Sequence, residues 1–183
     1  MYKFLLVICF VLLTAACSQV QVNDYAEVQP KLDPTSFFTG KLSAHGIIQD
    51  RNHKVLRHFS ADIQASWNAG IGTLVEDFVF DDGETQQRIW TLTPDGQGGY
   101  IGSAGDVVGG GQLSFSGNAL FLDYVLRIPY GDSTIDVRVD DRMYLVTPNI
   151  LINQSRMSKF GVGVGSILLT IIRHPEQIHD THT

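Results

Sequence analysis

Apolar and polar residues alternate along most of the chain, and the alternation begins at Phe37. In the first segment the apolar or small set of positions is Phe38, Gly40, Leu42, Ala44, Gly46 and Ile48. A polar stretch, QDRNHK, separates it from a second segment whose apolar set is Val55, Phe59, Ala61, Ile63, Ala65 and Trp67. A two-residue period is typical of β-strands with one buried face. The pattern therefore predicts two strands joined by a hairpin.

Turn-forming sequences recur at short intervals through the rest of the chain: NAG, DDGE, PDGQGG, SGN, PYGDS and TPN. They divide the chain into about ten short strands, and no segment shows the period of an amphipathic helix. Consecutive hairpins favour a single antiparallel up-and-down β-barrel, which leaves no exposed sheet edge. We predict an all-β barrel domain over residues 37–173 and a polar tail over residues 174–183.

Residues 1–16 have the parts of a secretory signal peptide: an early Lys3, a short apolar stretch and two small residues at the end. The apolar stretch is too short to span a membrane, which takes about 20 residues. Cys17 follows directly, and this placement resembles the lipobox of bacterial lipoproteins, in which the cysteine becomes the new N-terminus and carries fatty acyl chains such as palmitate. Thr14 stands where the lipobox usually has leucine, and plain secretion is the alternative.

The lipoprotein interpretation places the chain in the bacterial cell envelope, held to the membrane through the lipid on Cys17. Two or more acyl chains are enough for stable anchoring. Ser18, in place of aspartate, favours the outer membrane, facing the periplasm, by analogy with lipoprotein sorting. Residues 17–36 are polar, contain Pro30 and Pro34 and lack periodicity. We expect them to form a tether between the lipid and the barrel.

Composition narrows the possible classes further. Removal of the signal takes away Lys3 and Cys9, which leaves twelve basic residues against nineteen acidic ones, a net charge of −7, and one cysteine. An acidic chain without a basic patch argues against nucleic-acid binding. One cysteine cannot form an internal disulfide, so the core must stabilise the domain.

The segment VEDFVFDDGETQQRIW predicts a hairpin that turns at Asp82-Gly83, because a two-residue type I′ loop needs positive φ at both positions. In that register Asp77 lies directly across from Arg88, and we predict a structural ion pair between them. Glu76 points to the opposite face and has no partner within the hairpin. Because adjacent strand residues diverge, the two carboxylates are not expected to form a catalytic pair.

A second hairpin turns at Gly131-Asp132 and places Tyr124 and Asp141 on one otherwise apolar face. The next turn, in the sequence TPN, sets Asp141 opposite Arg156 inside the barrel, with Gln154 nearby. Two interpretations stay open: a satisfied ion pair that closes one end of the core, or a polar anchor for the head group of a ligand. In the second interpretation the ligand-binding residues are Arg156, Asp141, Gln154 and Tyr124.

Other chemistry finds little support in the sequence. The alternating glycines of FGVGVGS lie on one strand without a following helix, unlike a dinucleotide-binding loop. No Gly-x-Ser-x-Gly nucleophile elbow is present, the histidines are scattered, and the acidic turn lacks the ligand spacing of an EF-hand. We therefore assign no catalytic residue, no metal site and no cofactor.

Three separated segments resemble, in the same order, a bacterial protein family of unknown function with many lipoprotein members: EDFVFDDGETQQRIW, GNALFLDYVLRIPY and DDRMYLVTPNILINQSRMSKFG. The resemblance covers most of residues 37–173. The family has no assigned activity, so it implies no catalytic residues. A weaker likeness to lipocalin-type (calycin) barrels rests on the all-β hairpin pattern. The lipocalin Gly-x-Trp motif is absent, since the first strand reads Gly40-Lys41-Leu42.

These patterns together predict an outer-membrane-anchored lipoprotein whose barrel binds or carries an apolar small molecule, such as a fatty acid or a phospholipid. Small inward-facing residues, among them Gly46 and Ala61, favour a hollow interior, because large side chains are needed to fill such a barrel. The alternative is a structural or partner-binding envelope lipoprotein with a solid core, in which the small residues mark tight curvature. A lipid-modifying enzyme is the third possibility.

Overall fold

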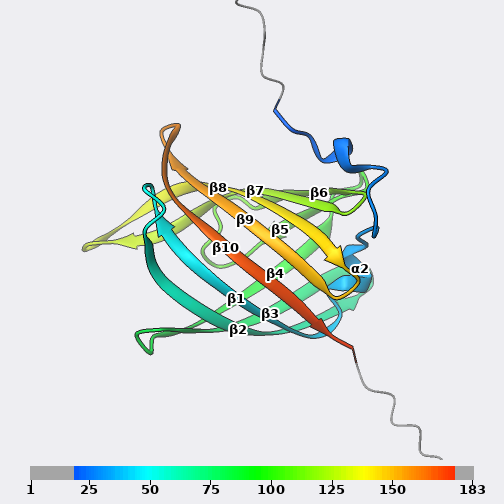
Figure 1. Cartoon of the computed structure of the whole chain (residues 1–183), viewed down its shortest axis with the longest axis horizontal. Helices are drawn as coiled ribbons and strands as arrows, with labels where there is room; N and C mark the ends of the chain where they lie inside the picture. Colours follow the sequence, from blue (N-terminus) through cyan, green and yellow to red (C-terminus); the bar gives the residue numbers. More distant parts are fainter. Residues whose placement is uncertain (1–18, 176–183) are drawn as a thin grey trace, which may run out of the picture.

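The computed structural model describes residues 19–175, which form a closed barrel of ten antiparallel strands (Figure 1). The strands are β1 (Gly40–Asp50), β2 (Val55–Asn68), β3 (Ile71–Phe80), β4 (Thr85–Pro94), β5 (Tyr100–Ser103), β6 (Gly111–Ser116), β7 (Ala119–Tyr130), β8 (Ser133–Thr147), β9 (Ile150–Lys159) and β10 (Val162–His174). Each strand pairs with its chain neighbours, and β10 pairs with β1 to close the ring. The predicted all-β, antiparallel up-and-down barrel is confirmed.

Two short helices precede the barrel, η2 (Val22–Tyr25) and α2 (Pro34–Phe37). In the part of the chain from 19 to 175, no helix combines the length and the apolar character needed to cross a membrane. The predicted signal peptide (1–16), the proposed lipid attachment site Cys17 and most of the polar tail lie outside the described residues.

In strand β2 the two-residue period of the sequence corresponds to an alternation of buried and exposed residues. Its inward-facing residues Phe59, Ala61, Ile63 and Ala65 are buried, while the residues between them are exposed. Burying a large apolar side chain contributes roughly 1.5–3 kcal/mol to folding. A one-residue slip would turn the whole apolar set outward, so burial fixes which face of the strand points into the barrel.

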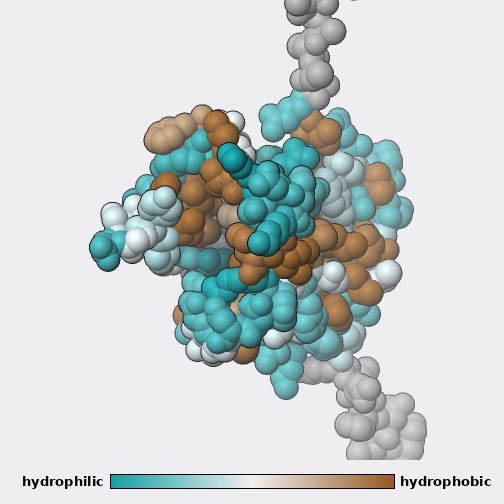
Figure 2. Space-filling model, turned by 60° about the vertical axis from the view of Figure 1, so that its left-hand side comes forward, coloured by the Kyte–Doolittle hydropathy of each residue, from teal (hydrophilic) through white to brown (hydrophobic). Residues whose placement is uncertain are grey.

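The barrel has two unlike ends, and Figure 1 shows α2 at one of them and hairpin tips at the other. The closed end, next to α2, gathers the turns at 69–70, 95–99, 117–118 and 148–149. The open end gathers the turns at 51–54, 81–84, 131–132 and 160–161, together with a longer loop at 104–110. Figure 2 brings the open end forward and shows apolar surface around a hollow there. Exposed apolar residues at its hairpin tips are Val55, Leu56, Phe160 and Val162.

Aromatic side chains around α2 plug the closed end. Phe37 and Phe38 are buried and pack edge to face, with their ring centroids 5.1 Å apart. The Trp67 indole N–H donates to the Phe38 carbonyl at 2.8 Å. Asp33 caps α2 by accepting from the Thr35 amide at 3.2 Å, which satisfies a donor that the helix leaves free. The plug therefore joins the N-terminal segment to the core.

Residues 19–38 form a strap that lies against the barrel, so the expected tether over 17–36 is wrong for its described part. The Tyr25 ring packs edge to face on Phe121, 5.9 Å between centroids, and its hydroxyl lies 3.3 Å from that of Tyr144. Leu32 is buried, and its amide donates to the Gly117 carbonyl at 2.7 Å. A Cβ at position 117 would lie 1.6 Å from the Tyr25 carbonyl oxygen, so the close approach requires glycine.

The hairpin between β3 and β4 differs from its prediction by one residue. The Gly83 amide donates to the Phe80 carbonyl at 3.0 Å, and the Phe80 amide donates to Glu84 at 2.9 Å. These bonds close a three-residue loop with Gly83 at φ +84°, the type I turn plus bulge that is the usual alternative to a two-residue loop. As a result Glu76, and not Asp77, lies opposite Arg88.

The hairpin between β7 and β8 has the predicted register, with Arg127 opposite Asp136 and Leu122 opposite Asp141. The turn between β8 and β9 also lies where it was predicted, with Thr147 opposite Ile150. A β-bulge between Leu145 and Thr147 then shifts the remaining pairs by one residue. Asp141 therefore lies opposite Ser155, and the predicted interior pair of Asp141 with Arg156 does not form.

Candidate ligand site in the barrel interior

Ionisable and polar side chains gather inside the barrel, between the apolar core of the closed end and the open end. We call this group the interior polar cluster. Its members come from five strands and one loop: Glu76 on β3, Arg88 on β4, Asp106 in the 104–110 loop, Tyr124 on β7, Asp141 on β8, and Asn153 and Ser155 on β9. Alternation along each strand turns these residues to the same side as the core.

The ion pair of Arg88 with Asp106 depends on two short strands. Because β5 and β6 are short, the 104–110 loop continues the wall next to β7, where the Val108 amide donates to Val125 at 2.9 Å. Arg88 donates to one carboxylate oxygen of Asp106 from Nε at 3.1 Å and from Nη2 at 2.6 Å. Burial favours a lower pKa for Arg88, but the charge and hydrogen bonds of Asp106 raise it overall. Arg88 stays charged and is neutralised by Asp106.

Asp141 is a buried carboxyl group without an ionic partner. The residue is 5% exposed, and its Oδ1 atom has no hydrogen-bond donor. Burial raises its pKa to about 6, although hydrogen bonding of the carboxyl group with the Ser155, Asn153 and Tyr124 side chains works in the opposite direction. The Oδ1 atom of Asn153, which is 4% exposed, also lacks a donor. Two buried acceptors therefore face the interior without a hydrogen bond.

Glu76 is enclosed by the barrel wall but keeps some accessible surface. Burial raises its pKa to about 7; Arg88 opposes this shift, while Asp141 and Asp106 add to it. Solvent therefore reaches part of this residue although it faces the barrel interior. Arg88 and Phe78, which also face inward, are likewise only partly buried. At the level of the polar cluster, three inward-facing residues are therefore partly accessible to solvent.

Acidic groups outnumber basic ones in this cluster. Three carboxyl groups, those of Glu76, Asp106 and Asp141, share the interior with one guanidinium. Burial raises the pKa of Tyr124 well above 10, so its hydroxyl remains neutral. The Tyr124 ring packs edge to face on Trp90 at 5.4 Å between centroids, which lines the cluster with aromatic surface.

Aromatic residues continue from the cluster to the open end. Phe59 and Phe78 pack edge to face at 5.6 Å, and Phe78 stacks on Phe80 at 6.2 Å between centroids. The Arg57 guanidinium lies 3.9 Å from the centre of the Phe80 ring and donates to Asp82 at 2.7 Å. The entrance therefore combines an apolar wall with a charged rim.

The structure brings together two of the four predicted ligand-binding residues. Tyr124 and Asp141 face the interior as expected. Arg156 and Gln154 are exposed on the outer face of β9, where they line a surface pocket of about 360 Å³. Because Arg156 points outward, the prediction that it lies inside the barrel and anchors a ligand carboxylate there is wrong. The role of these residues in binding a ligand stays a prediction.

The predicted ion pair of Asp77 with Arg88 is wrong as well. Asp77 faces outward and accepts from the Gln87 amide at 2.8 Å, while Arg88 faces inward to Asp106. Sequence reasoning noted that Glu76 had no partner in its hairpin, which is the signal of an inward-facing carboxyl group. It missed Asp106 because this residue lies in a loop. It missed Asn153 and Ser155 because the bulge at residue 146 turns their side chains to the inner face of the barrel, where the prediction had placed Gln154 and Arg156.

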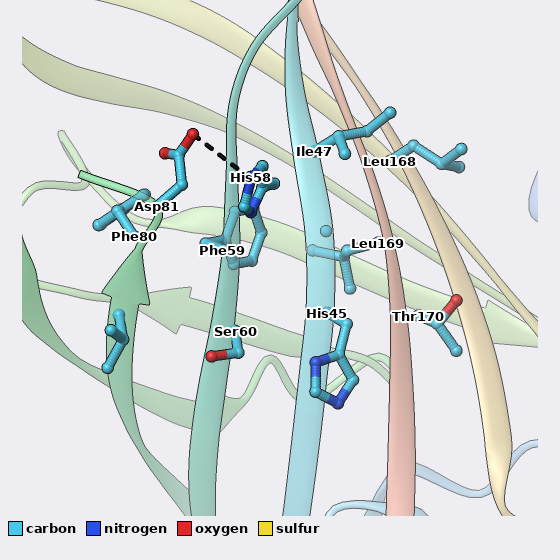
Figure 3. Close-up of a pocket in the computed structure, with 12 residues that line it drawn as sticks. His45, Ile47, His58, Phe59, Ser60, Phe80, Asp81, Leu168, Leu169 and Thr170 are labelled. Carbon is cyan, nitrogen blue, oxygen red and sulfur yellow. Dashed lines mark ion pairs between the residues drawn. The ribbon is translucent and has the colours of Figure 1, made fainter. Parts of the chain in front are cut away.

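A shallow groove of about 690 Å³ crosses the outer faces of β1, β2, β3 and β10 (Figure 3). His58 lies 3.5 Å from the Asp81 carboxylate there, and Ile47 and Leu168 add apolar surface. Among the residues 19–175, no group of three or more His, Cys, Asp or Glu side chains is placed to hold a metal ion. The groove is a candidate contact surface, whereas the perturbed carboxyl groups lie inside the barrel.

Comparison with known proteins identifies the family. The family model described as "Protein of unknown function (DUF3833)" matches residues 11–173, and the chain belongs to this family. No sequence among the curated proteins matches the chain. Rv2717c from M. tuberculosis is similar in structure, with a TM-score of 0.54 and 13% identity over 81% of this chain and 100% of that one. The S-type phycobiliprotein lyase CPES from Guillardia theta has a TM-score of 0.48 and 12% identity over 76% and 89% of the two chains. At these identities the likeness concerns the fold alone.

Proposed function

Starting from membership in a family of unknown function, we propose that this chain is a lipid-anchored envelope protein whose barrel binds an apolar small molecule with a polar end. The observation that carries the proposal is that Glu76, Phe78 and Arg88 face inward in the barrel and remain partly accessible to solvent. Ligand sites are typically concave, mostly apolar and equipped with a few polar groups that orient the ligand. The interior polar cluster and the aromatic wall above it have this composition.

The small residues of the wall support the proposal only in part. A Cβ at Gly46 would lie 2.6 Å from the Phe59 ring, so this glycine is required by close packing and leaves no space of its own. Ala44, Ala61 and Ala65 belong to the buried core. The support for a hollow interior therefore comes from the accessible polar residues nearer the open end.

The proposed location rests on the sequence LLTAACS, in which Cys17 would carry the lipid. The substitution Cys17→Ala is expected to move the protein from the membrane fraction to the soluble periplasmic fraction. If the variant still sediments with membranes, the lipid attachment at Cys17 is wrong. Outer-membrane placement is tested separately by density separation of the wild-type membranes.

The binding proposal is tested with the Cys17→Ala protein purified without detergent. Native mass spectrometry is expected to show a co-purified small molecule, and an apolar fluorescent probe is expected to bind and be displaced by that molecule. Protein that carries no adduct and binds no apolar probe would contradict the proposal. It would favour a partner-binding lipoprotein, for which the outer groove near Ile47 and Leu168 is the candidate contact surface.

A further inference from the structure

We infer that the interior polar cluster receives a positively charged, hydrogen-bond-donating head group, an organic ammonium carried on an apolar body. The inference rests on the proposed function and names the class of ligand that the interior would select. It follows from which donors and charges of the cluster are already in use and which acceptors are left without partners.

The positive charge inside the cluster is already neutralised. Arg88 donates twice to Asp106, at 3.1 and 2.6 Å. The Asn153 amide nitrogen is used in a 3.3 Å bond to Ser155 Oγ. An anionic ligand would therefore have to displace Asp106 from Arg88, and it would enter a space that holds two further carboxyl groups. Juxtaposing like charges is unfavourable, so this cluster selects against carboxylates and phosphates.

Two of the buried acceptor atoms, by contrast, have no hydrogen-bond partner. Oδ1 of Asp141 and Oδ1 of Asn153 have no donor, and both residues are more than nine-tenths buried. Leaving a buried acceptor without a hydrogen bond is costly, so a ligand that donates to these atoms gains binding energy that a ligand without donors does not. Glu76, on the wall of the same space, supplies a second carboxyl group without an ion-pair partner of its own.

The aromatic rings of the site favour the same class of ligand. Trp90 and Tyr124 meet edge to face at 5.4 Å beside the cluster, and Phe78 lies next to Arg88 and Phe59. Ring faces attract cations, and ammonium groups are commonly bound among aromatic side chains and carboxylates. The apolar wall towards the open end accommodates the hydrocarbon part of such a molecule.

Three probes with the same twelve-carbon chain test the inference: dodecylammonium, dodecanoate and dodecanol. Titrations use the Cys17→Ala protein at pH 8, above the raised pKa values of Glu76 and Asp141. Dodecylammonium is expected to bind at least about tenfold more tightly than dodecanoate. Asp141→Asn, which keeps the shape and removes the charge, is expected to weaken dodecylammonium by about tenfold and to change dodecanol by less than about twofold.

The matched control is Asp77→Asn, an outward-facing carboxylate next to Glu76 in the chain. It is expected to leave all three affinities unchanged, which separates the interior site from general attraction of cations to an acidic protein. Glu76→Gln provides a second interior variant if Asp141→Asn does not fold.

The outcomes separate this inference from the proposed function. If dodecanol binds but dodecanoate binds as tightly as dodecylammonium, the inference is wrong and the binding proposal stands. The inference is also wrong if the interior variants weaken dodecylammonium no more than Asp77→Asn does. If none of the three probes binds the wild-type interior, the proposed function itself fails.

Discussion

The two halves of the barrel bury their inward faces in different ways. Near α2 the inward residues are apolar and almost fully buried: Leu42, Leu120 and Leu151 are exposed by 2% or less. Towards the open end the inward residues include Glu76 and Arg88, which are ionisable and partly accessible. Both halves belong to the same strands, so the difference lies in the residues that the sequence places at equivalent inward positions.

The comparison indicates that the two halves have different roles: the closed half stabilises the fold, and the open half holds the candidate site. Buried carboxyl groups without ionic partners destabilise a fold, and they persist where they serve binding or catalysis. The closed half is therefore expected to stabilise the fold, and the inward carboxyl groups of the open half to destabilise it. Changes in the two halves are therefore expected to have opposite effects on the free energy of unfolding.

The largest expected effect is in the closed half. Leu151 is fully buried, and Leu151→Ala is expected to lower the free energy of unfolding by roughly 3–5 kcal/mol, because it removes buried methyl groups and leaves a cavity. Urea unfolding measures the change. Leu168→Ala is the matched control, since Leu168 faces outward and is 45% exposed. Equal losses for the two variants would remove the distinction between the inner and outer faces.

The second prediction concerns the open half and has the opposite sign. The folded-state pKa of Glu76 is raised to about 7 from 4.5, so the folded protein holds a proton that the unfolded chain releases between these values. Wild-type stability should therefore fall as the pH rises from about 4 to 7. Glu76→Gln should stabilise the protein by roughly 3 kcal/mol at pH 8 and have little effect at pH 4.

Urea unfolding from pH 4 to pH 8 checks this pH dependence. The charged and titratable groups that face Glu76 are Arg88 on β4, Asp106 in the 104–110 loop, Tyr124 on β7 and Asp141 on β8. Asp141 has a raised pKa of its own and is expected to leave a smaller slope of the same sign in the variant. An unchanged slope in Glu76→Gln would mean that Glu76 is not the group responsible.

A smaller effect is expected at the cap of the closed end. Asp33 accepts from the Thr35 amide and from the Ser36 hydroxyl at the start of α2. Asp33→Ala should lower the free energy of unfolding by about 1 kcal/mol, because the first turn loses its capping acceptor. Asp33→Asn keeps an acceptor and should retain most of the stability. If both variants lose the same amount, the capping bond is not the cause.

The smallest effect is expected on the outer face of the open half. Arg127 and Asp136 form an exposed ion pair, with Nε and Oδ1 2.8 Å apart. Exposed pairs gain little, because water screens the attraction and both side chains lose freedom. A double-mutant cycle with Arg127→Ala and Asp136→Ala should show coupling near the detection limit. Strong coupling would indicate that the outer face also contributes to the behaviour of this half.

The sequence predicted the barrel well because its evidence is repeated along the chain. Each strand carries a period of two and each hairpin carries its own turn sequence, so errors in one hairpin do not spread to the next. The β7–β8 hairpin has the register that its turn sequence predicts: Gly131 takes a positive φ of 57°, and Arg127 pairs with Asp136.

The site was harder to predict because it depends on single-residue offsets. One extra loop residue before Gly83 exchanged Asp77 for Glu76 opposite Arg88, and one bulge residue exchanged Arg156 for Ser155 opposite Asp141. Neither offset carries a strong sequence signal, since bulges are tolerated by many residue types. Asp106 belongs to a loop whose path depends on the shortness of β5 and β6. This is a tertiary feature, and the local sequence pattern does not predict it.

The strap over residues 19–38 limits how far the protein could travel. If Cys17 carries the proposed lipid, only four residues separate it from η2 (Val22–Tyr25), which packs against β6 and β7. Fully extended, this stretch reaches roughly 17 Å. With the proposed lipid on Cys17, a connection this short would keep the barrel next to the membrane that holds the lipid. If the barrel also binds the proposed ligand, uptake and release would take place near that surface, and transport to a second membrane would require another protein.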